Sequence, residues 1–73
     1  MNEPLPILVE NSVQIAWDFL ELSGEIADPA EASKFLQNTV VDLVLKGERR
    51  RMMLSNRAIT AYQKFREQQL KAA

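Results

Sequence analysis

Residues 28–47 read DPAEASKFLQNTVVDLVLKG, and this stretch carries the signals for both ends of a helix. Asp28 can cap the helix, Pro29 suits its first position, and Glu31 follows the cap by three residues in a near-match to the capping box. At the other end, Gly47 is a typical residue just past a helix C-terminus. These signals predict a helix that begins and ends within the quoted stretch.

The interior of the stretch has the apolar spacing of an amphipathic helix over residues 29–46. Its main apolar stripe consists of Ala32, Leu36, Val40, Leu43 and Val44. Val41 and Leu45 point about 100° or more away from the centre of that stripe. We therefore expect these two side chains either to be exposed or to face a second neighbour.

A first helix is predicted over residues 6–23, because Pro6 is tolerated in a first helical turn and Gly24 is a natural stop. Apolar side chains cover an arc of roughly 220° around this helix, which is wider than the stripe of a one-sided surface helix. They are Leu8, Val9, Val13, Ile15, Ala16, Trp17, Phe19, Leu20 and Leu22. Such a helix must be covered from at least two sides.

A third helix is predicted over residues 48–71, where a weak heptad seam is visible. The seam consists of Leu54, Ala58, Ala61, Phe65, Gln68 and Ala72, and a secondary apolar line consists of Met52, Ile59 and Leu70. The stripe of the preceding helix does not continue in register across Gly47, so we favour a break there over one helix spanning residues 28–71. The three helices predict an all-α fold, a small three-helix bundle in a single domain of residues 1–73.

Charge is divided between the two halves of the chain. There are nine basic and ten acidic residues and the net charge is −1, yet every lysine and arginine lies at or after Lys34. Arg50, Arg57, Lys64 and Lys71 are seven residues apart and form one line along the third helix, which we call the basic line. A solvated cationic face is the plain interpretation, and contact with a partner is the functional one.

The strongest candidates for partner binding lie where the third helix begins. Consecutive arginines at a helix N-terminus oppose the helix dipole, and such a conflict can indicate an anionic partner or an acidic neighbouring helix. Methionines beside them offer adaptable apolar contacts. The candidate site residues are Arg49, Arg50, Arg51, Met52, Met53 and Arg57.

Composition argues against catalysis, cofactors and metals. Without Cys or His, the chain lacks a thiol nucleophile, an imidazole base and the usual ligands of zinc or copper. Its two glycines do not form a phosphate-binding loop, so we expect a non-catalytic protein with no cofactor. The N-terminus lacks the basic start of a signal peptide, and no apolar run approaches the roughly 20 residues that span a bilayer. We therefore expect a cytoplasmic protein without a membrane partner.

A homodimeric protein-interaction module is the favoured function. Three short helices cannot readily cover all the apolar surface of this sequence, and a second copy would enlarge a small core. An antiparallel third helix from that copy would bring Arg50, Arg57 or Lys64 towards Asp18 and Glu25. An acidic protein surface is the other candidate partner.

A nucleic-acid-binding regulator is the alternative function. The second and third helices could form a helix-turn-helix, with Arg49, Arg51, Asn56 and Arg57 near the start of a recognition helix. The sequence pI of about 5.3 argues against it, because a basic footprint is the first expectation for such proteins. The acidic first helix would also repel phosphates.

Overall fold

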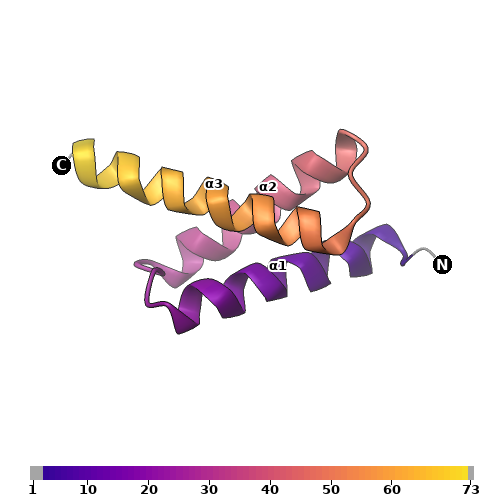
Figure 1. Cartoon of the computed structure of the whole chain (residues 1–73), viewed down its shortest axis with the longest axis horizontal. Coiled ribbons are helices and arrows are strands. Elements are labelled where there is room, and N and C mark those ends of the chain that lie inside the picture. Colours follow the sequence, from indigo (N-terminus) through magenta and orange to yellow (C-terminus); the bar gives the residue numbers. More distant parts are fainter. Residues whose placement is uncertain (1–2, 73) are drawn as a thin grey trace.

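The computed structural model describes residues 3–72, which form three α-helices joined by two short links (Figure 1). The helices are α1 (Leu5–Leu22), α2 (Pro29–Leu45) and α3 (Arg51–Ala72). The described range contains no strand, so the predicted all-α, three-helix bundle is confirmed. None of these three helices is long and apolar enough to cross a membrane.

Local sequence signals set the start of α2 as predicted. The Asp28 carboxylate accepts hydrogen bonds from the backbone N–H groups of Ala30 (3.0 Å) and Glu31 (3.2 Å), and Pro29 takes the first helical position. The Glu31 carboxylate accepts a hydrogen bond from the Gln69 amide of α3 at 3.2 Å. Asp28 therefore caps α2, and the Glu31 side chain, three residues later, links α2 to α3.

Gly47 separates α2 from α3, so the alternative of one helix over residues 28–71 is wrong. Its φ of +106° is a conformation that residues with a Cβ rarely adopt. Gly24 lies after α1 with a φ of +72°. Both glycines thus end helices where the sequence predicts an end.

Each helix buries a row of residues spaced by four. The rows are Leu8, Ser12, Ala16 and Leu20 in α1, then Ala32, Leu36, Val40 and Val44 in α2, and Leu54, Ala58 and Tyr62 in α3. Rows of this spacing interdigitate when two helices cross at about 50°. Figure 1 shows α2 passing obliquely across the other two helices. Small side chains within the rows allow the backbones to approach closely at the crossings.

The heptad seam predicted for the third helix is confirmed at Leu54, Ala58 and Phe65 but not at its other positions. The buried row continues from Ala58 to Tyr62, which is fully buried, rather than to Ala61, which is half-buried. The later seam positions, Gln68 and Ala72, are exposed. In Figure 1 the C-terminal turns of α3 extend past both other helices, so a seam there has nothing to pack against.

An aromatic cluster joins α2 to α3. The ring of Phe35 stacks on that of Phe65 with the centroids 4.6 Å apart, and it meets the Tyr62 ring edge-on at 5.8 Å. These contacts identify the flank of α3 that faces α2. Met52 and Ile59 lie on another side of α3, about 120° or more around the helix from Phe65.

Candidate partner-binding site

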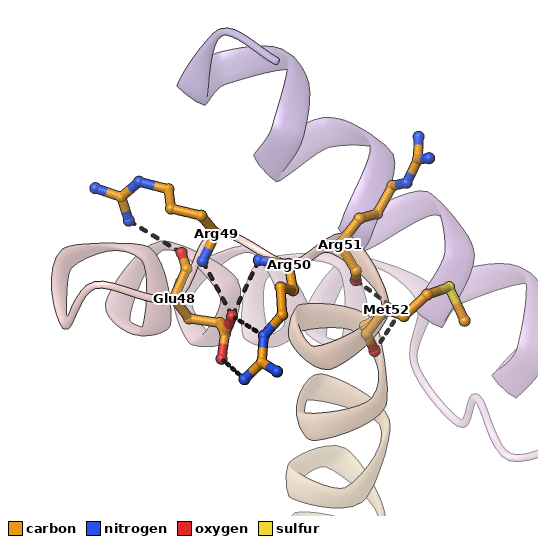
Figure 2. A network of polar contacts seen from close by, with 6 residues as sticks. Glu48, Arg49, Arg50, Arg51 and Met52 are labelled. Atoms are coloured by element: carbon orange, nitrogen blue, oxygen red, sulfur yellow. Dashed lines mark hydrogen bonds and ion pairs between the residues drawn. The ribbon is translucent and has the colours of Figure 1, made fainter. Parts of the chain in front are cut away.

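The link between α2 and α3 is organised by the carboxylate of Glu48 (Figure 2). Its Oε2 atom accepts hydrogen bonds from the backbone N–H groups of Arg49 (3.1 Å) and Arg50 (3.0 Å). The Arg50 guanidinium completes the arrangement through Nε at 3.1 Å and Nη2 at 3.3 Å. Because these bonds hold Arg49 and Arg50 in the link, α3 begins at Arg51, three residues later than the predicted start.

The hydrogen bond from the Arg50 side chain lowers the pKa of Glu48 to about 2, from an ordinary value of 4.5, and backbone N–H groups assist. The same interaction raises the pKa of Arg50. Both groups are ionised at neutral pH. The cationic charge of Arg50 is therefore partly neutralised within the chain.

Arg49 binds the end of α2. Its Nη1 donates to the backbone carbonyl of Val44 at 2.6 Å and to that of Glu48 at 3.0 Å. The Val44 carbonyl also accepts a hydrogen bond from the backbone N–H of Gly47 at 3.0 Å, so the guanidinium adds a second bond at the C-terminal end of α2. Arg49 thus has a structural role that its sequence position alone does not predict.

Arg51 points in a third direction, towards the start of α1. Its Nη1 lies 3.5 Å from Oε1 of Glu3, whose other carboxylate oxygen accepts a hydrogen bond from Asn11 at 2.7 Å. Figure 2 shows the three arginine side chains diverging from one another. The run that the sequence marks as one site is therefore divided among three partners within the chain.

The remaining predicted residues also separate. Met52 is exposed, whereas Met53 is half-buried. The backbone carbonyls of Arg51 and Met52 accept bonds from the buried hydroxyl of Ser55 (Figure 2). Arg57 is exposed, one and a half turns further along α3. The structure does not gather the six candidates into one surface.

A groove on the outer side of α2 and α3 brings together three of the six candidates, Arg49, Arg50 and Arg57, with residues of α2. Two adjoining hollows, of about 500 and 360 Å³, share Arg57 as a wall. We call them together the α2–α3 groove. The first hollow lies between the two helices and is lined by residues that include Leu43, Lys46, Arg49, Arg50 and Arg57. The second hollow continues along α3 alone, where Arg57, Ala61 and Lys64 line it. Three of the four members of the basic line, all but Lys71, therefore face one groove.

The sequence identified Arg57 and the seven-residue spacing of the basic line, but it did not reveal which α2 residues lie opposite that line. Leu43 and Lys46 come from α2, and no pattern in the sequence indicates that they meet Arg57. The basic line was the available signal, because its members must share one side of a helix. Which neighbour that side meets depends on how α2 and α3 cross.

The groove presents charged and apolar side chains to solvent. Within residues 3–72 no group of three or more His, Cys, Asp or Glu side chains is placed to hold a metal ion. Comparison of the chain with known protein families, with characterised proteins and with solved structures finds no match.

Proposed function

We propose that this chain is a small, non-catalytic protein-interaction module that forms a homodimer through an apolar surface between α1 and α3. We call this surface the α1–α3 face. It consists of Ile15, Phe19 and Leu22 from α1 together with Met52 and Ile59 from α3. The observation that carries the proposal is that large side chains of this face are exposed to solvent in the single chain.

The α1 part of the face is a flank that its neighbours do not cover. Ile15, Phe19 and Leu22 are spaced by four and three, which places them on one side of the helix. Phe19 is 49% exposed and Leu22 is 90% exposed. The other flank of α1, with Val9 and Val13, lies along α2. The wide apolar arc of α1 is thus covered on one side and left open on the other.

The α3 part of the face lies beside this open flank. Met52 and Ile59 are seven residues apart, and Met52 is 59% exposed. Two contacts that join α3 to the segments just before and just after α1 support this placement. Arg51 pairs with Glu3 near one end, and the Gln63 amide donates to Glu25 at 3.0 Å near the other.

Burial of the α1–α3 face in a dimer is energetically favourable. Fully covering a large aliphatic or aromatic side chain contributes about 1.5–3 kcal/mol. A domain of this size gains little from its own core, so a second copy adds stability as well as covering the face. A two-fold axis through the face would bring the same residues together from both copies and close the assembly.

Leu70, which is 68% exposed, continues the line of Met52 and Ile59 along α3, whereas Val41 and Leu45 do not extend this surface. Val41 and Leu45 lie on the outer side of α2, where they are 38% and 80% exposed. The sequence predicted that these two side chains would either be exposed or face a second neighbour, and they are exposed. Single exposed apolar residues are common on monomeric proteins and indicate no partner.

A pair of matched substitutions tests the proposal, because α1 and α2 each end in an exposed leucine. Leu22→Glu places a charge in the α1–α3 face and should convert the dimer into a monomer, measured by size-exclusion chromatography with light scattering. Leu45→Glu makes the same change outside the face and should leave a dimer. A monomeric parent protein, or equal effects of the two substitutions, would contradict the proposal.

A nucleic-acid-binding regulator is the second candidate, and the observation that favours it is the set of cations along the α2–α3 groove. Binding of nonspecific double-stranded DNA at two salt concentrations separates the two functions. Phosphate contacts release counterions, so a regulator would bind at low salt and lose affinity steeply as salt increases. An interaction module should show no binding at low salt.

A further inference from the structure

Most basic side chains of this protein already have a partner within the chain. Six of the nine make a hydrogen bond or ion pair: Lys46, Arg49, Arg50, Arg51, Arg66 and Lys71. Within residues 3–72, no side chain or carbonyl is bonded to the other three, Lys34, Arg57 and Lys64. Arg57 and Lys64 line the α2–α3 groove, so two of the three unpaired cations face one surface.

The groove also has an apolar floor. Leu43 from α2 lines the first hollow, Ala61 from α3 lines the second, and both are half-buried. The small side chain of Ala61 leaves room between the two cations, Arg57 on one side and Lys64 on the other. An occupant would therefore meet an apolar strip beside a row of positive charge.

We propose that the α2–α3 groove binds an acidic amphipathic helix of a partner protein. The apolar side of that helix would pack on Leu43 and Ala61, and its carboxylates would pair with Arg57 and Lys64. These two cations are seven residues apart, a distance of about 10.5 Å along α3. Carboxylates seven residues apart on a partner helix have the same spacing, so one helix can reach both cations.

Charge and shape favour a peptide over nucleic acid. Glu48 lines the groove, and Asp42 stands 3.0 Å from Lys46 at its edge, so carboxylates interrupt the positive surface where a phosphate backbone would pass. An apolar floor flanked by charged side chains is the usual form of a groove that binds an amphipathic helix. Nucleic-acid surfaces carry a broader continuous basic patch.

The groove remains open in the proposed dimer. It lies on the α2 flank of α3, whereas the α1–α3 face lies on the opposite flank, so a second copy bound there does not occupy it. The groove proposal therefore stands independently of the dimer. A monomeric protein would present the same groove.

Peptide binding tests the inference directly. The probe is a dye-labelled peptide of leucine and glutamate at amphipathic helical spacing, with glutamates seven residues apart, measured by fluorescence anisotropy. Arg57→Glu should weaken binding roughly tenfold or more, because it removes a charge-assisted hydrogen bond and adds repulsion. Lys34→Glu makes the same charge change at an unpaired cation outside the groove and should change affinity less than about twofold.

Four results would overturn the inference. They are no binding of the glutamate peptide, equal binding of a matched glutamine peptide, equal weakening by Lys34→Glu and Arg57→Glu, and tighter binding of double-stranded DNA of similar length. Circular dichroism of each variant checks that the helices remain intact. Since both substituted residues are exposed, neither change should unfold the protein.

Discussion

At the scale of single residues, two buried hydroxyl groups stand out. The side-chain oxygens of Ser12 and Tyr62 are buried, and neither has a hydrogen-bond partner within the part of the chain that the structure describes. An unsatisfied buried polar group costs about 1–3 kcal/mol. Both residues lie in the packed rows, where their size and shape fit between helices even though their hydroxyls do not bond.

Replacement of Tyr62 by phenylalanine should therefore stabilise the protein. Tyr62→Phe removes the unpaired hydroxyl and keeps the ring that meets Phe35. We expect the free energy of unfolding to rise by about 1 kcal/mol, measured by urea denaturation. A fall in stability would show that the hydroxyl makes a favourable contact that this structure lacks.

The carboxylate of Glu48 makes stability depend on pH. Its folded pKa of about 2 lies below the ordinary 4.5, so its stabilising contribution is complete above pH 4.5 and is lost as the pH falls towards 2. Glu48→Gln keeps a hydrogen-bond acceptor but removes the charge. We expect the variant to be less stable at pH 7, and the difference from the parent protein to shrink between pH 4.5 and 2.

Chemical denaturation at a series of pH values measures that difference, and NMR titration of the Glu48 side-chain carboxyl measures its pKa directly. An NMR titration that gave Glu48 an unshifted pKa near 4.5 would contradict the hydrogen-bonded arrangement seen in the link. The same result would show that Arg50 is free in solution.

At the scale of helices, the helix ends were predictable because they depend on residues close together in the sequence. The buried residues of α3 were not fully predictable, because they depend on the angles at which the helices cross. The Asp28 cap and the Gly47 stop act within a few residues, so the ends of α2 were predictable. Tyr62 rather than Ala61 enters the core because α3 crosses its neighbours obliquely. That crossing is a property of three helices together, and a heptad count along one of them cannot reveal it.

Gly47→Ala tests the break between α2 and α3. Nothing lies within 4 Å of a Cβ added at this position, so any cost must come from the backbone, whose φ is +106°. We expect a loss of about 1–3 kcal/mol in the free energy of unfolding by urea. Unchanged stability, or a gain in helical signal by circular dichroism from fusion of α2 and α3, would contradict this account.

At the scale of the whole molecule, α3 carries two different surfaces on its two flanks. The α1–α3 face is apolar, and the α2–α3 groove is cationic. The division of charge along the sequence indicated that charged surfaces would matter. It did not predict that Arg49, Arg50 and Arg51 would each bind another part of the same chain.

The candidate site was therefore predicted in part. Arg57 was identified from the basic line, and the structure places it in the groove. Lys64 was seen in the same line but was not chosen, because only the fold shows that it shares the groove with Arg57. Arg49 and Arg50 bind groups within five residues of themselves, whereas Arg51 and Glu3 are far apart in sequence and meet only after folding.

The central claim is that two copies meet through the α1–α3 face. Mixed samples of isotope-labelled and unlabelled protein test it, since isotope-filtered NMR detects only contacts between copies. The account predicts intermolecular contacts from the side chains of Phe19, Leu22 and Met52. Their absence at high protein concentration, or intermolecular contacts confined to the α2–α3 groove, would contradict it.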